Sequence, residues 1–158
     1  MLNLITDRTA TDVARYDYFK GKNWADLTED EQTEFLNGLK GCYNYTDFER
    51  VETAVSTLSA ILRQYGYANN VTLSEASTFT YSYIRKKGEL QTYLNNISIL
   101  KNAFPVSQEI VPNINEWLTY EGANAIEKIL YDIDTGISNM EQNWKYVGEV
   151  ISGEGYFA

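Results

Sequence analysis

Residues 120–144 read YEGANAIEKILYDIDTGISNMEQNW, and this stretch decides the fold that we predict. Its main apolar residues recur at spacings of 4, 3, 4, 3 and 4: they are Ile126, Leu130, Ile133, Ile137, Met140 and Trp144. Such spacing places an apolar stripe along one side of a helix and is typical of coiled coils and helical bundles. We therefore expect a long helix here, although Gly136 weakens it by about 1 kcal/mol relative to Ala.

Two further stretches carry the same kind of stripe. After Thr46-Asp47-Phe48-Glu49, which has the form of a capping box, apolar residues follow at spacings of 4, 3, 4 and 3. They are Val51, Val55, Leu58, Leu62 and Tyr65. The other stripe consists of Leu90, Leu94, Ile97, Leu100 and Phe104. Gly66 and Pro105 follow these stripes as stop signals, so we predict helices over 46–65 and 88–104.

The remaining segments are shorter or less regular. One short helix should run from Thr9 or Thr11 to about Lys20, and another should begin after the N-cap Thr28 and stop near Gly41. Residues 67–84 break the helical pattern, and the alternation of Phe79, Tyr81 and Tyr83 with polar residues predicts an extended segment. The last stretch, KYVGEVISGEGYFA, is interpreted as an extended C-terminal arm.

These elements predict a mainly α protein. The chain has 158 residues, which is enough for one core without a metal or disulfide staple. We expect residues 1–144 to form a single helical domain and residues 145–158 to form the arm. The apolar stripes can pack within one chain or between chains, and three of them in so short a chain favour a bundle within one chain.

The charge and hydropathy of the chain restrict its partners. A net charge of −9 disfavours nucleic acid and anionic membranes, because both require a clustered positive surface. The longest apolar runs, such as 129–131, are far shorter than the roughly 20 residues of a membrane span. The N-terminus lacks the basic and apolar regions of a signal peptide, so we expect a soluble protein made in a cytoplasm.

The residues offer little for catalysis. The chain contains no histidine and one cysteine, Cys42, which removes His-dependent triads, His-ligated zinc and an internal disulfide. The string Asp132-Ile-Asp134-Thr-Gly136 lacks the glycine and final acid of a calcium loop. We predict no catalytic residue, no cofactor and no metal site. A pair of carboxylates is the one catalytic device that 22 acidic residues can still supply.

The starts of two predicted helices resemble each other. Tyr45-Thr-Asp-Phe-Glu-Arg-Val51-Glu52 aligns with Tyr120-Glu-Gly-Ala-Asn-Ala-Ile126-Glu127, with tyrosine, a β-branched residue and glutamate at matching positions. The match is short, and two amphipathic helices with a common entry pattern would explain it equally well.

Several stretches resemble prophage-encoded structural proteins of gut Firmicutes, which are described as phage tail or virion-associated proteins. These stretches are Leu4–Thr9 with the following TDVARY, Trp24–Glu31, Gly38–Glu52, Leu118–Glu127 and Trp144–Gly153. The helix start Thr46-Asp47-x-x-Arg50-Val51-Glu52 is similar to segments of tail-fibre and baseplate proteins. The resemblance implies a structural protein of the tail, baseplate or fibre-attachment region, made in the bacterial host cytoplasm and ending in the virion.

The resemblance implies assembly with other virion proteins and with copies of the chain in a symmetric oligomer, and it implies no catalytic residue. We expect the C-terminal arm to provide the contacts through Trp144, Tyr146, Val147, Val150, Ile151, Tyr156 and Phe157. Two alternatives remain. One is a carbohydrate-binding adaptor at a tail tip that stacks sugars on Trp24, Trp117 or Trp144; the other is a cell-wall hydrolase with paired carboxylates.

Overall fold

The computed structural model describes residues 2–67, 73, 86–113 and 118–152, and for residues 144–152 it describes the backbone alone. Its elements are α1 (Ala10–Lys20), a 3-10 turn (Trp24–Asp26), α2 (Glu29–Leu36), α3 (Tyr45–Gln64), α4 (Lys87–Ala103) and α5 (Tyr120–Ser152). The described part of the chain contains no strand. The mainly α prediction is therefore confirmed.

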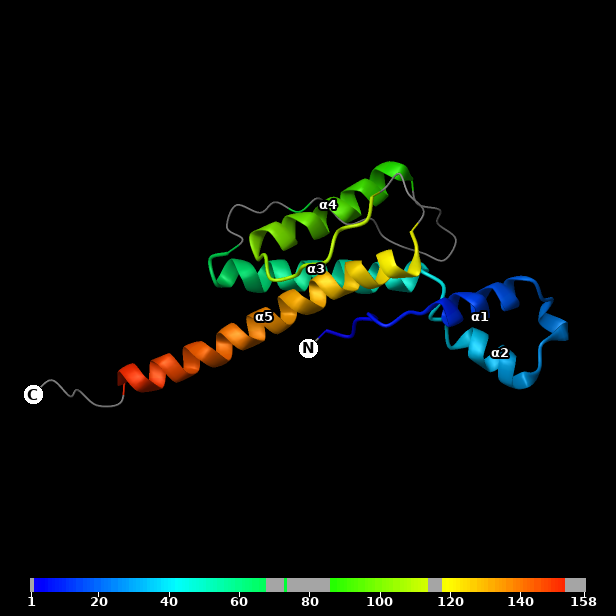
Figure 1. Cartoon of the computed structure of the whole chain (residues 1–158), viewed down its shortest axis with the longest axis horizontal. Coiled ribbons are helices and arrows are strands. Elements are labelled where there is room, and N and C mark those ends of the chain that lie inside the picture. Colours follow the sequence, from blue (N-terminus) through cyan, green and yellow to red (C-terminus); the bar gives the residue numbers. More distant parts are fainter. Residues whose placement is uncertain (1, 68–72, 74–85, 114–117, 153–158) are drawn as a thin grey trace, which may run out of the picture.

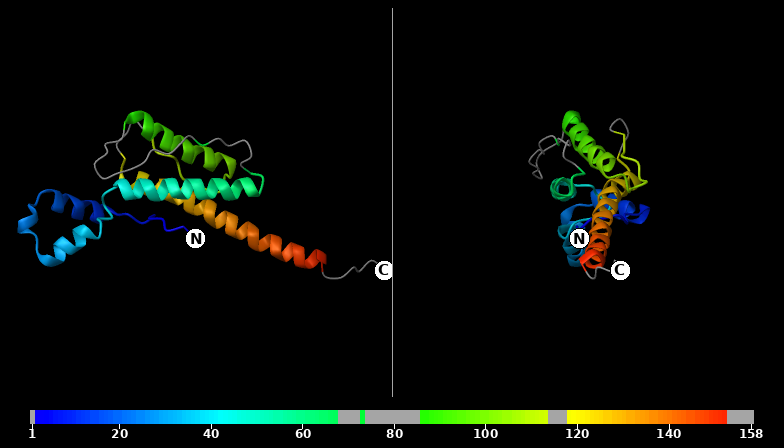
Figure 2. Two further views of the ribbon diagram at one scale, coloured as in Figure 1. Left: turned by 180° about the vertical axis from the view of Figure 1, so that it is seen from behind. Right: turned by 90° about the vertical axis from the view of Figure 1, so that its left-hand side faces the viewer.

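The three longer helices form the core of the molecule. Each of α3, α4 and α5 packs against the other two, as Figures 1 and 2 show. The core consists of Val51, Ala54, Val55, Leu58, Leu62, Tyr93, Ile97, Leu100, Phe104, Ile126, Ile129, Leu130, Ile133 and Ile137. Because all three predicted stripes contribute to one cluster, the bundle within one chain is confirmed.

Burial along the stripes shows where the core ends. Leu58, Ile97 and Ile133 are fully buried, and each such side chain stabilises the fold by roughly 1.5–3 kcal/mol relative to an exposed one. Tyr65, the residue that follows α3, and Met140, the last stripe residue of α5 whose side chain is described, are only half-buried. The bundle core therefore thins out towards this end.

The N-termini of the helices have polar caps. The side chains of Thr9 and Thr28 cap α1 and α2, each in a reciprocal capping box. The prediction for Thr28 is confirmed, and of the two candidates for α1 the structure selects Thr9 over Thr11. The prediction for α3 was wrong by two residues, because its N-cap is Asn44 and not Thr46. The Asp47 carboxylate accepts the backbone N–H of Asn44 at 2.7 Å, and this bond starts the helix earlier.

Helices α1 and α2 form a hairpin beyond one end of the bundle (Figure 1). Phe19 and Leu27 are its buried apolar residues. Helix α2 ends at Leu36, before the predicted stop near Gly41. Gly38 adopts a positive φ of 91°, a left-handed conformation that commonly terminates helices and that glycine adopts without strain.

Helix α5 is longer than predicted, and its extra length corrects the prediction of an extended arm. Residues 145–152 are helical. The physical reason lies in the spacing, because Val147 and Ile151 continue from Trp144 in steps of 3 and 4 and so prolong the stripe. Residues 153–158 lie outside the described residues, as does most of the predicted extended segment 67–84.

Gly41 sets how closely the hairpin approaches the start of α3. A Cβ atom at this position would lie 2.0 Å from the carbonyl oxygen of Asp12, which is backbone and cannot rotate away. We expect Gly41→Ala to lower the free energy of unfolding by about 1–3 kcal/mol, the usual cost of overpacking, as measured by urea denaturation.

Gly88→Ala, in the first turn of α4, is the matched control, because a methyl group added there would have no neighbour within 4 Å among the described residues. This variant should be as stable as the unmodified chain or slightly more stable, since alanine favours helices. Equal stability of the two variants would contradict the close approach at Gly41.

Candidate functional site

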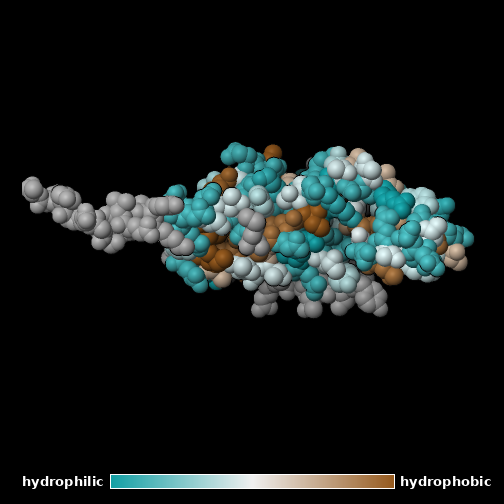
Figure 3. Space-filling view, turned by 90° about the horizontal axis from the view of Figure 1, so that it is seen from below, coloured by the Kyte–Doolittle hydropathy of each residue, from teal (hydrophilic) through white to brown (hydrophobic). Residues whose placement is uncertain are grey.

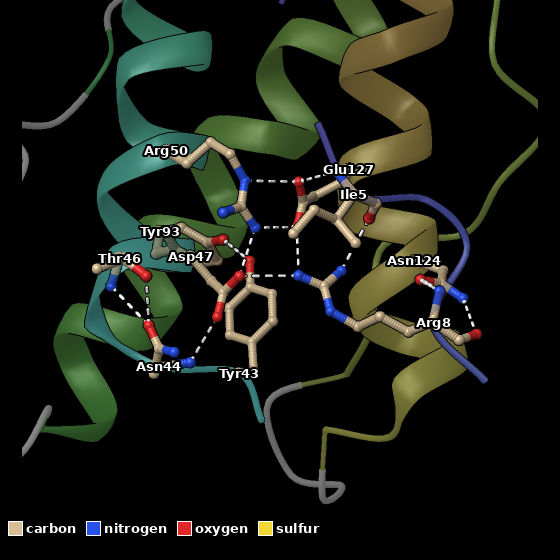
Figure 4. A network of polar contacts seen from close by, with 10 residues as sticks. All are labelled: Ile5, Arg8, Tyr43, Asn44, Thr46, Asp47, Arg50, Tyr93, Asn124 and Glu127. Carbon is tan, nitrogen blue, oxygen red and sulfur yellow. Dashed lines mark hydrogen bonds and ion pairs between the residues drawn. The ribbon is translucent and has the colours of Figure 1, made fainter. Parts of the chain in front are cut away.

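A buried network of four charged side chains lies where the N-terminal segment meets α3 and α5 (Figure 4). Arg8 comes from the segment before α1, Asp47 and Arg50 come from the first turns of α3, and Glu127 comes from α5. The formal charges sum to zero. Arg8, Asp47 and Glu127 are buried, so these charges are separated from water and depend on one another.

Glu127 is the centre of this network. Its Oε1 accepts hydrogen bonds from the Nη2 atoms of Arg8 and Arg50, at 2.7 and 2.8 Å. Its Oε2 accepts the backbone N–H of Ile5 at 2.7 Å and Nε of Arg50 at 3.0 Å. An ionised carboxylate offers about four acceptor positions, so every one is used. These hydrogen bonds offset the cost of burying the carboxylate.

Asp47 has two roles. Its Oδ2 closes the capping box of α3 on the Asn44 N–H, while its Oδ1 accepts from Arg8 at 2.9 Å and also from Arg50. The start of α3 and the ion network are therefore joined through one side chain. Burial by itself would lower the pKa of the Arg50 guanidinium, but its hydrogen bonds to Glu127 and Asp47 outweigh that effect and raise the pKa.

The N-terminal segment is tied to α5 through further side chains. Asn124 binds Arg8 reciprocally, accepting its backbone N–H at 3.0 Å and donating to its backbone oxygen at 2.8 Å. Nearer the terminus, the Leu2 N–H donates to Asp134 at 3.1 Å. With the Ile5 bond to Glu127, three backbone N–H groups of the segment end on side chains of α5.

Two tyrosines close the network on its α4 side. The hydroxyls of Tyr43 and Tyr93 lie 2.6 Å apart and share a hydrogen bond. The Arg8 guanidinium lies over the Tyr43 ring, 5.2 Å from its centre, which is within the range of a cation–π interaction. Burial raises the pKa of the Tyr43 phenol well above its ordinary value, so the phenol stays neutral.

The arrangement holds the fold together and is poorly suited to catalysis. Asp47 and Glu127 are the carboxylates that it brings together, but both are fully engaged by arginines and backbone donors. A general acid or base must reach the group with which it exchanges a proton, and these oxygens already bind donors of the protein. Among the described residues, no group of three or more candidate ligands is placed to hold a metal ion.

The predicted interface residues lie at the other end of the molecule. Trp144, Tyr146, Val147, Val150 and Ile151 belong to the last turns of α5, where the backbone alone is described. Tyr156 and Phe157 lie outside the described residues. The structure thus brings five of the seven into one helical segment and does not place the other two.

This part of α5 extends past the bundle. Among the described side chains, the contact between α5 and the bundle that lies nearest the C-terminus is a hydrogen bond. The Tyr65 hydroxyl, at the end of α3, donates it to Glu141. Gln142 and Asn143 are exposed, and the helix then continues to Ser152 as a projection, seen in orange and red in Figures 1 and 2. Residues 142–152 span about 16 Å at 1.5 Å per residue.

The α1–α2 hairpin presents aromatic surface. The Trp24 and Phe35 rings meet edge to face with centres 5.9 Å apart, and the two residues are 48% and 45% exposed. Tyr18 is also exposed, with its hydroxyl bound to Glu31. Trp117, another candidate for sugar stacking, lies outside the described residues. Figure 3 shows apolar residues in separate patches on one side of the molecule and no single large apolar surface.

Comparison of the chain with protein families, curated proteins and solved structures found no match. None of the described helices is both long enough and apolar enough to cross a membrane.

Sequence reasoning missed the ion network. Two of its four residues could have been recognised, because Asp47 and Arg50 belong to the Thr46-Asp47-x-x-Arg50-Val51-Glu52 helix start. The aligned glutamates of the two similar helix starts are not equivalent in the fold. Glu127 is fully buried, whereas Glu52 is half-buried.

Loss of the Glu127 charge should destabilise the protein strongly. Glu127→Gln leaves two arginines with one carboxylate in a buried site, and breaking a buried ion pair in this way costs roughly 3–5 kcal/mol. We expect a loss of that order in urea denaturation followed by circular dichroism.

Glu34→Gln is the matched control, because its bidentate pair with Arg15 is more than a third exposed. Exposed pairs contribute at most about 1 kcal/mol, so this variant should remain close to the unmodified chain. A Glu127→Gln variant as stable as the control would contradict the central role of Glu127.

Proposed function

We propose that this protein is a bacteriophage virion structural protein of the tail, baseplate or fibre-attachment region, which acts through protein–protein assembly. The observation that carries the assembly role is the projection of α5 beyond the bundle (Figure 1). A helix that leaves its own core and keeps an apolar stripe is a typical attachment element. The phage assignment rests on the resemblance of both ends of the chain to virion-associated proteins.

The form of the molecule supports an assembly role. The ion network and the three-helix core make one body, and the residues of α5 in its core cluster run from Ile126 to Ile137. Helix α5 runs without a break from the body into the projection, so a single helix connects the two parts.

Truncation separates the two parts. A chain ending at Asn143 keeps every core residue and the Tyr65–Glu141 bond, so it should stay helical with an unfolding midpoint close to that of the full chain. In phage particles produced with the truncated chain, we expect its incorporation to fall at least tenfold, measured by quantitative mass spectrometry of purified virions.

A full-length Trp24→Ala variant is the companion to that test, because it alters the opposite end of the molecule and should still be incorporated. Full incorporation of the truncated chain, or absence of the unmodified chain from purified particles, would contradict the proposal.

A second candidate function is carbohydrate binding at a tail tip, which the exposure of Trp24 favours. An exposed indole beside a second aromatic ring is a surface on which sugar rings can stack. We expect host cell-wall glycans to shift the tryptophan fluorescence of the unmodified protein and to leave that of Trp24→Phe less affected. An equal shift in both proteins, or none in either, would argue against this site.

A further inference from the structure

The apolar stripe of α5 continues past the end of the bundle. Within the bundle the buried face includes Ile129 beside the seam residues Ile126, Leu130 and Ile133. From residue 138 onwards the seam continues with Met140, Trp144, Val147 and Ile151, again in steps of 4, 3 and 4. An apolar seam at heptad spacing is typical of a coiled coil.

The position of α3 determines which partners can use this stripe. Residues Ile126, Leu130, Ile133 and Ile137 of the stripe pack in one cluster with residues of α3 and α4. A heptad stripe drifts by only about 20° per heptad around a straight helix, so positions 144–151 lie on nearly the same side of α5 as the core. A partner helix that contacts these positions must therefore pack on the side of α5 that α3 covers as far as Tyr65.

From this geometry we propose that the projecting part of α5 pairs with the same segment of a second copy of this chain, in antiparallel orientation. The inference rests on the proposed assembly role of this helix and names its partner. A parallel partner in register would place its own residues 120–140 where α3 and α4 already lie. An antiparallel partner instead places only the C-terminal end of its α5 on this side of the helix, next to the end of α3.

The heptad positions define the pairing. With Leu130, Ile137, Trp144 and Ile151 at position a, antiparallel layers join a to d: Trp144 lies opposite Val147 of the second copy, and Ile151 lies opposite Met140. The paired segments of the two helices then end next to Glu141, because the contact of Glu141 with Tyr65 marks where α3 begins to cover this side of α5. The end of the bundle and the heptad register thus agree on one alignment.

Charges along this alignment do not oppose pairing with an identical helix. The flanking positions place Glu141 near Gly148 of the second copy and Asn143 near Val150. No like charges face each other at these positions, although the whole chain carries a net charge of −9. The helix is also anchored in the bundle, which removes much of the nucleation cost that makes isolated helices of this length unstable.

Light scattering on the full chain tests self-association. We expect the mass to rise with concentration towards twice the 18.1 kDa of one chain. Val147→Lys, which puts a charge at a central stripe position, should weaken dimerisation at least tenfold, while Gln142→Lys, at an exposed position off the stripe, should leave it unchanged. Circular dichroism confirms that both variants stay folded. A full chain that stays monomeric, or equal effects of the two variants, would overturn the proposal.

Disulfide formation tests the orientation. In a Cys42→Ser background, a mixture of the Met140→Cys and Ile151→Cys chains should yield a cross-linked pair with one chain of each kind. Positions 140 of the two copies would lie about 16 Å apart along the axis, too far for the roughly 7 Å between Cα atoms that a disulfide permits. Cross-linking of Met140→Cys with itself would overturn the antiparallel arrangement.

Particle incorporation distinguishes this inference from the proposed function. If the unmodified chain is monomeric and the chain ending at Asn143 is still lost from particles, the helix binds a different virion protein and the antiparallel dimer is wrong. If the chain dimerises as described and truncation leaves incorporation intact, the dimer stands and the virion attachment role of the helix fails.

Discussion

The hydrogen bonding of Glu127 is the interaction on which the rest of the structure depends. A fully buried carboxylate is tolerated only when its charge is compensated and its acceptor positions are filled. Here Arg8, Arg50 and the Ile5 N–H fill them, and each comes from an element that the chain must bring to α5. The network therefore fixes the N-terminal segment, the start of α3 and the middle of α5 in one arrangement.

That arrangement explains how a short chain carries one very long helix. The first part of α5 is covered by α3, by α4 and by the N-terminal segment, whose bonds run from Asn124 to Asp134. The second part leaves the bundle as a continuation of the same helix. A helix held so firmly at one end can project from the body without its own tertiary contacts, because its nucleation cost is already met. The body and the projection are thus connected by one continuous helix.

The elements that sequence reasoning predicted well are those with local causes. The cap at Thr28 requires only side chains three residues apart, and the stripes of α3, α4 and α5 require only helical periodicity. The predictions that were wrong concern segments in which two local patterns compete. The segment offers two boxes, Asn44 with Asp47 and Thr46 with Glu49, and only the folded helix distinguishes them. The glycines after Trp144 suggested an extended arm, but the stripe through Val147 and Ile151 outweighed them.

The sequence by itself determined that the protein is helical, where most of its helices begin, and which apolar residues form the core, because these properties follow from spacing along one chain. Only the tertiary structure decided that Arg8, Asp47, Arg50 and Glu127 form one network, since their partners lie up to 119 residues apart. It also decided which part of the α5 stripe is covered by α3 and α4 and which part extends past them. Periodicity marks a face as apolar, but the length of the neighbouring helices determines where that face needs another partner.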